Sequence, residues 1–222
     1  MEEKIAFIHT SATLVPLFTD LASNSLPGVA TFHIANDSLI KDVIASGCLT
    51  PDVAWRVAEL VRQAEGSGAT RILVTCSSIG AAVEASRLFV SVPVYRVDQA
   101  MAEKAVASGS RIGVIATLPT TLEPTRNLVE RVAKTALKEI DVQSHLCEGA
   151  FEALMSGDPE AHDASVREGL FALMADCDVI LLAQASMARV VDTIPAEECR
   201  VPILSSPALA MQWLAGQLDS DK

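Results

Sequence analysis

Short apolar runs alternate with longer amphipathic stretches along the whole chain. Residues 5–8, 72–75 and 179–183 are runs rich in branched apolar side chains, typical of strands that helices cover on both faces. Further strands are predicted at residues 30–34, 111–116, 142–145 and 203–204. Between them, helical periodicity or turn residues predict helices up to residue 25 and over 51–65, 79–89, 125–139, 149–155, 161–176, 187–193 and 207–217. This alternation predicts an α/β fold with mostly parallel sheets.

The pattern occurs twice. The segment that ends at Thr10 matches the segment that ends at Thr117, and the segment around Cys76 matches the one around Gln184, at nearly the same spacing. A third match joins Val92-Pro93-Val94 to Val201-Pro202-Ile203. We therefore predict two similar α/β units, residues 1–97 and 98–204, with residues 205–222 packing back on the first. Equivalent loops of a duplicated fold are expected to surround one shared cleft.

Composition and charge narrow the function classes. The chain has 222 residues and a formal net charge of −11, which disfavours nucleic acid and anionic membranes as partners. No apolar stretch approaches the roughly 20 residues that span a bilayer, and no secretory leader is evident at the amino terminus. We expect a cytoplasmic protein. The five cysteines are widely spaced without a C-x-x-C pair, which argues against a disulfide framework and against a zinc site.

Candidate site residues follow the strands, because ligands of open parallel sheets bind outside the carboxyl ends of the strands. Cys76 comes where a strand ends and a helix begins, so backbone N–H groups are expected to stabilise its thiolate. Hydroxyls and amides suited to holding a carboxylate surround it in the pattern: Thr10, Ser11, Asn36, Ser77, Ser78, Thr117, Thr121, Gln184 and Ser186. His9 is a candidate acid–base group. No G-x-G-x-x-G follows the first strand, so a dinucleotide is not expected.

The chain resembles the cofactor-independent aspartate/glutamate/hydantoin racemase superfamily. The resemblance covers essentially the whole chain and rests on residues 74–80, 111–117, 149–151, 178–181 and 183–188. It implies two Rossmann-like α/β/α units related by a pseudo-twofold axis, with the active site between them, and a homodimer. It also implies that no metal, pyridoxal phosphate or nucleotide takes part, and that two cysteines flank the α-carbon of a small carboxylate.

The sequence departs from this pattern at the second cysteine, where it has Gln184. A carboxamide cannot exchange protons near neutral pH and can only hydrogen-bond. The first expectation is a racemase or isomerase that acts through the thiolate of Cys76 on an amino acid or a hydantoin-like compound, with His9 as a candidate acid–base group on the Gln184 side. A decarboxylase or lyase with one cysteine, a cis–trans isomerase of an unsaturated diacid and a non-catalytic metabolite-binding relative remain the alternatives.

Overall fold

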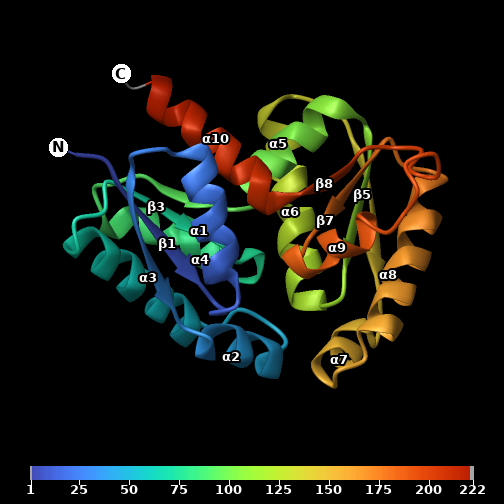
Figure 1. Ribbon diagram of the computed structural model, residues 1–222, viewed down its shortest axis with the longest axis horizontal. Helices are drawn as coiled ribbons and strands as arrows, with labels where there is room; N and C mark the ends of the chain where they lie inside the picture. The colour runs from blue at the N-terminus through green and yellow to red at the C-terminus, as the bar shows by residue number, and fades with distance from the viewer. Residues whose placement is uncertain (1, 221–222) are drawn as a thin grey trace. The chain divides into compact units, whose positions relative to one another are not determined.

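The fold, taken from a computed structural model that describes residues 2–220, contains two all-parallel four-stranded sheets (Figure 1). The first has the order β2-β1-β3-β4 and the second β6-β5-β7-β8, so the strand order is the same in both. The strands are β1 (Lys4–His9), β2 (Ala30–Ala35), β3 (Arg71–Val74), β4 (Val94–Arg96), β5 (Arg111–Ala116), β6 (Asp141–Leu146), β7 (Val179–Leu182) and β8 (Ile203–Ser205). The predicted α/β class with two parallel sheets is confirmed.

The residues form two compact units. Unit 1 comprises the chain up to Gln99 together with the residues from Pro207 onward, and unit 2 is Ala100–Ser206. The helices are α1 (Leu14–Ser25), α2 (Ser38–Ser46), α3 (Pro51–Gly66), α4 (Gly80–Ser86), α5 (Gln99–Ser108), α6 (Pro119–Thr135), α7 (Ala150–Met155), α8 (Pro159–Met174), α9 (Ala188–Val191) and α10 (Ser206–Ser220). Short 3₁₀ turns are η1 (Ser77–Ile79), η2 (Arg87–Phe89) and η3 (Ala185–Met187).

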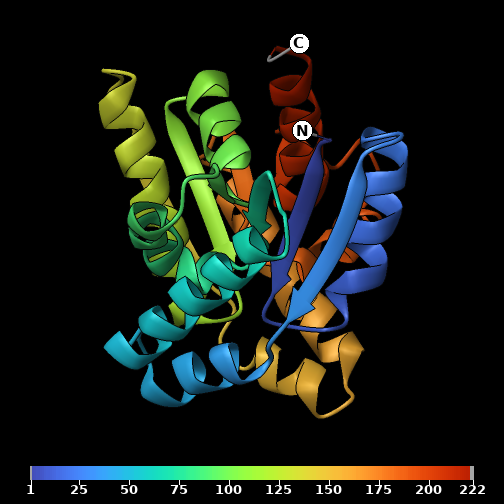
Figure 2. The same ribbon diagram turned by 90° about the vertical axis from the view of Figure 1, so that its left-hand side faces the viewer.

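In unit 1, alternate residues of β1 enter two different cores. Ala6 and Ile8 pack with α2, α3 and α4, whereas Ile5 and Phe7 pack with α1 and α10 on the other face. Figure 2 shows α2 and α3 on one side of this sheet and α1 on the other. Because both faces of the strand are covered, a continuous apolar run is stable there as a strand.

Unit 2 repeats this arrangement. Helix α8 packs against β5 and β7, with Leu170 among its fully buried residues, and α6 lies against β5 and β6. The helix preceding β5 contributes Met101 and Ala105, both fully buried.

The structure shifts several predicted helix boundaries, most of all the start of α6, and adds two helices. We expected a loop up to Pro124, since a proline inside a helix removes one backbone hydrogen bond. Helix α6 instead begins at Pro119. Pro119 suits the first helical position, and the helix continues through Pro124. Helices α2 and α5 were not expected.

Helix α2 is short, and its start depends on side-chain hydrogen bonding. The Asn36 Oδ1 accepts from the Ser38 N–H at 3.1 Å and from the Ser38 hydroxyl at 2.6 Å. Such Asx turns start helices without a long apolar pattern. The following helix begins as expected, since the Thr50 hydroxyl accepts from the Val53 N–H at 3.3 Å. Over residues 2–220, no helix is both long and apolar enough to cross a membrane.

Candidate active site

The carboxyl ends of β1, β2 and β3 bring several predicted residues to one edge of the unit 1 sheet. These strands are neighbours in the sheet, and backbone bonds continue past their ends, from Asn36 N–H to His9 C=O and from Thr75 N–H to Ile8 C=O, both at 2.9 Å. Thr10 and Cys76 are therefore adjacent, each one residue beyond one of these bonds.

Cys76 is surrounded by hydrogen-bond donors. It has extended backbone angles, φ −131° and ψ 118°, and precedes η1. Its sulfur interacts with the Thr10 and Ser78 hydroxyls and with the backbone N–H groups of Ser78 and Ile79. Thr10, Ser77 and Ser78 are themselves buried. The donors that we expected at the start of a helix are thus present, on the turn that immediately follows the strand.

Burial outweighs these donors in setting the protonation of Cys76. Burial raises the pKa of the thiol above its ordinary value of 9.0, although the hydrogen bonds from Thr10, Ser78 and Ile79 lower it. We expected the start of a helix to lower the pKa of Cys76 and so stabilise its thiolate. That expectation is wrong, because the net shift of the pKa is upward. The free-energy cost of removing a thiolate from water is larger than the stabilisation that these four hydrogen bonds provide. At neutral pH the resting residue is a thiol.

His9 occupies a different environment from the one its sequence position suggested. It is fully buried, its Nδ1 lies 2.8 Å from the Thr75 Oγ1, and its Nε2 lies 2.9 Å from the His33 Nδ1. The Thr75 hydroxyl is also 3.1 Å from the Ile8 carbonyl; when it donates there, His9 Nδ1–H donates to Thr75 and Nε2 accepts from His33.

Burial and the neighbouring His33 lower the pKa of His9 to about 4. Both ring nitrogens are used within unit 1, so neither is presented to a ligand. His9 therefore links His33 within β2 to Thr75 just beyond β3, an arrangement that does not favour proton transfer to a ligand.

Two other predicted residues of unit 1 make local bonds. Ser11 is half-buried, and its hydroxyl lies 2.7 Å from the Thr13 hydroxyl. The oxygen of the Asn36 amide is occupied by the start of α2. Both lie at the carboxyl edge of the sheet, but Thr10, Ser78 and Cys76 form the connected group.

Unit 2 builds an equivalent turn around Gln184. Its backbone angles, φ −133° and ψ 138°, are close to those of Cys76, and η3 follows it as η1 follows Cys76. The Gln184 Oε1 accepts from the Thr117 N–H at 2.6 Å and from the Thr117 hydroxyl at 3.0 Å. Thr117 corresponds to Thr10, so the same neighbour serves a thiol in one unit and an amide in the other.

The remaining predicted residues of unit 2 lie in the same region. Thr121 is buried in the first turn of α6, and Ser186 is exposed on η3. The hydroxyl of Thr120, between Thr117 and Thr121, is buried without a hydrogen-bond partner. A buried hydroxyl of this kind is costly unless a ligand or water satisfies it.

Sequence reasoning missed the residues that follow β4 and β6. Arg96 and Asp98, at and just beyond the end of β4, form a buried ion pair, and the exposed Glu148 follows β6. Their position after a strand could have identified them, because ligands bind beyond the carboxyl end of every strand of a parallel sheet, the rule that selected Cys76. Among residues 2–220, no group of three or more His, Cys, Asp and Glu side chains is arranged to hold a metal ion.

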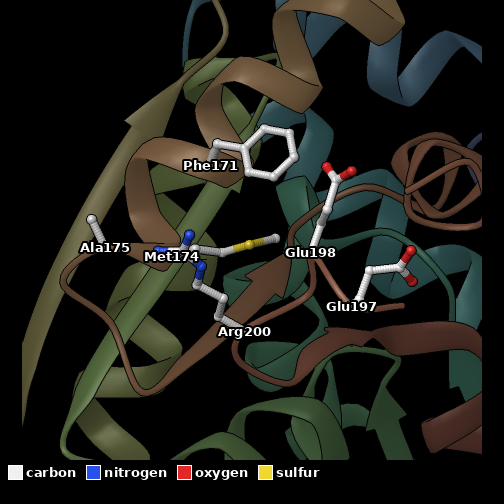
Figure 3. Close-up of a pocket in the computed structure, with 6 residues that line it drawn as sticks. All are labelled: Phe171, Met174, Ala175, Glu197, Glu198 and Arg200. Atoms are coloured by element: carbon white, nitrogen blue, oxygen red, sulfur yellow. The ribbon is translucent and has the colours of Figure 1, made fainter. Parts of the chain in front are cut away.

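A pocket of about 470 Å³ lies elsewhere in unit 2 (Figure 3). It is lined by Phe171, Met174 and Ala175 of α8 and the residues after it, and by Glu197, Glu198 and Arg200. The latter three precede β8, so the pocket is at the amino edge of the sheet, away from Gln184. None of the predicted site residues lines it.

Comparison with known proteins relates this fold to racemases. Among solved structures, glutamate racemase RacE1 from Bacillus anthracis aligns with a TM-score of 0.75 and 19% identity over 99% of this chain and 82% of its own. Allantoin racemase from Klebsiella pneumoniae aligns with a TM-score of 0.71 and 19% identity, over 98% and 88% of the two chains. Aspartate racemase from Picrophilus torridus gives 0.73 and 13%, over 96% and 94%.

At these identities the structural matches establish the fold alone. A search of curated proteins found no significant match. The model of the Asp/Glu/hydantoin racemase family, however, matches residues 5–214, nearly the whole chain, and confirms the resemblance noted in the sequence. This protein therefore belongs to the Asp/Glu/hydantoin racemase family.

Proposed function

We propose that the protein is a cofactor-independent racemase that exchanges the proton at the α-carbon of a small carboxylate, an amino acid or a hydantoin-like compound, through Cys76. Family membership supports the reaction type. The observation that carries the proposal is the environment of Cys76, a half-buried thiol at the end of β3 with two hydroxyls and two backbone N–H groups around its sulfur.

The chemistry requires a base strong enough for a weakly acidic C–H bond. In the proposed step the Cys76 thiolate takes the α-proton, an S–H bond forms as the C–H bond breaks, and the electron pair moves onto the adjacent carbonyl oxygen. Hydrogen-bond donors such as the Ser78 and Thr10 hydroxyls would stabilise that charge. The new S–H exchanges its proton with solvent, and the thiol then reprotonates the same face of the carbon with retention of configuration. A proton delivered by water to the opposite face, with the thiol then losing its own proton to solvent, gives the inverted configuration.

The raised pKa of Cys76 fits this demand, since a thiolate of higher pKa is a stronger base. The same raised pKa makes the Cys76 thiolate scarce at neutral pH. The exchange rate is therefore expected to rise with pH, about tenfold per pH unit, until the pH passes the pKa of the thiol, above 9.0. A rate that falls with rising pH would assign Cys76 the role of an acid alone.

Gln184 transfers no proton in this proposal and serves as a hydrogen-bonding residue, because its amide oxygen already accepts two bonds from Thr117. A single thiol works from one side of a carbon atom. We therefore expect deuterium from D₂O to enter the α-position faster than the configuration inverts.

The test is proton NMR in D₂O with a panel of amino acids and hydantoins that includes glutamate, aspartate and allantoin. Loss of an α-proton signal with the native protein, its absence with Cys76→Ala and its retention with Cys48→Ala would support the proposal. Cys48 is an exposed cysteine of the same unit and serves as the matched control. Unchanged exchange in Cys76→Ala would refute the role of Cys76.

A second candidate is a non-catalytic metabolite-binding member of the family. Two observations favour it: burial keeps Cys76 protonated, and Gln184 offers only hydrogen bonds. Binding of a panel compound, seen as saturable chemical-shift changes without deuterium incorporation at any pH up to 10, would select this candidate over the first.

A further inference from the structure

A buried ion-pair cluster lies directly behind the turn that carries Cys76. Arg96 donates from Nε to the Asp98 Oδ1 at 2.9 Å and from Nη2 to the Asp98 Oδ2 at 2.8 Å. Its Nη1 donates to Glu84 Oε1 at 2.7 Å. The side chains of Arg96 and Asp98 are 2% and 0% exposed. Three hydrogen bonds thus hold the planar guanidinium in one orientation, and the two to Asp98 form a bidentate pair.

The guanidinium occupies the space that a side chain at residue 80 would need. A Cβ built on Gly80 would lie 2.2 Å from the Arg96 Cζ and 2.5 Å from its Nη2. Gly80 has ordinary helical angles, so the glycine is required by space and not by backbone conformation. Arg96 therefore packs against the backbone of Gly80, which follows η1 and begins α4.

That backbone is part of the donor turn of Cys76. The N–H of Gly80 donates to the Ser77 carbonyl, and the N–H groups of Ser78 and Ile79, just before it, interact with the sulfur. Glu84 belongs to α4 itself, so Arg96 joins the end of β4 to this helix as well as to its first residue. The cluster fixes both ends of the first turn of α4.

Unit 2 lacks the cluster. The matching positions, by the alignment of the two copies, are Ala188 for Gly80, Ser205 for Arg96 and Pro207 for Asp98. In that copy the turn follows Gln184, whose side chain is held by Thr117 and not by N–H groups of its own turn. The arginine thus accompanies the unit that has the thiol.

We propose that Arg96, held by Asp98 and Glu84, is the positioning residue of the Cys76 turn: its guanidinium packs under Gly80 and sets where the Ser78 and Ile79 N–H groups meet the sulfur. The importance of this for catalysis rests on the proposed function. The geometry itself can be tested on the thiol without any substrate.

The test is the pH profile of alkylation of Cys76 by iodoacetamide, followed by mass spectrometry of its peptide. Gly80→Ala is made in the native protein and in Arg96→Ser/Asp98→Asn, which removes the guanidinium and its buried counter-charge. We expect Gly80→Ala to move the midpoint of alkylation upward by about one pH unit in the native background, and to have no further effect where Arg96 is absent. Ala188→Gly is the matched control in unit 2 and should leave the profile unchanged.

Arg96→Lys provides a second test that keeps the positive charge but loses the fork. We expect it to raise the midpoint in the same direction as Gly80→Ala, with the native secondary structure retained by circular dichroism. Equal shifts from Gly80→Ala with and without Arg96, or a native profile in both Gly80→Ala and Arg96→Lys, would overturn the proposal. If Cys76→Ala kept its exchange activity while these shifts appeared, the proposed function would fail and the positioning role would stand.

Discussion

At the scale of single residues, two nearly identical backbone environments give different chemistry because one side chain differs. Cys76 and Gln184 both follow a buried strand in extended conformation and precede a 3₁₀ turn. The sulfur sits among donors that would stabilise a negative charge, whereas the amide oxygen accepts from Thr117 and stays neutral. The sequence was sufficient to place both residues just after a parallel strand, which is a topological property. It was insufficient for the pKa of Cys76, which depends on how completely the folded chain excludes water.

His9 gives a residue-scale prediction for pH. Its pKa is about 4 in the folded protein against an ordinary 6.5, so the unfolded chain binds the proton more readily. Stability is therefore full above about pH 6.5 and falls as the pH drops towards about 4, by roughly 3 kcal/mol. We expect His9→Gln to reduce this fall in urea denaturation at pH 7.5, 5.5 and 4.5. Asp178, whose pKa is held at about 2 by Arg111 and Ser110, titrates outside this window. An identical fall in the variant would contradict the prediction.

At the scale of elements, periodicity located the buried strands well and the helix ends less well. The runs at β1, β3 and β7 are apolar because helices cover both faces. Helix α6, by contrast, starts five residues before a proline that a local rule treats as a boundary. Such cases are decided by contacts between elements, which no local pattern contains. The contact between Arg96 and the backbone at residue 80, which requires a glycine there, is another example.

Gly169 of α8 gives the prediction at this scale. A Cβ there would lie 2.5 Å from the His145 ring on β6 and 2.8 Å from Ile115 on β5. Gly169→Ala should therefore separate the helix from the sheet and lower the free energy of unfolding by about 1–3 kcal/mol, despite the better helix propensity of alanine. Gly216→Ala in α10 is the matched control, because nothing lies within 4 Å of a Cβ there, and it should stabilise by up to about 1 kcal/mol. Urea denaturation compares the two, and equal effects would refute the argument from packing.

At the scale of the whole molecule, unit 1 is discontinuous in sequence. The chain leaves it after Gln99, forms unit 2 and returns through α10. Met211 and Leu214 of that helix are fully buried in the core that contains Phe7 and Phe18, so α10 completes the core of the first unit. Unit 1 therefore cannot finish folding during synthesis until unit 2 has been made, whereas unit 2 is one continuous segment.

This arrangement predicts that each unit has its own stability. Leu214→Ala and Leu170→Ala remove the same atoms from fully buried sites in unit 1 and unit 2, and each should cost about 2–5 kcal/mol. In native-state hydrogen exchange, we expect Leu214→Ala to reduce the protection of amides in β1 and β3 more than in β5 and β7, and Leu170→Ala to show the reverse. Reading each variant at both sheets provides the internal control, because a non-specific loss would affect all four strands alike. Equal loss of protection in both sheets for both variants would mean that the two units unfold as one cooperative body, and the separate cores seen at α8 and α10 would then not mark separate units of stability.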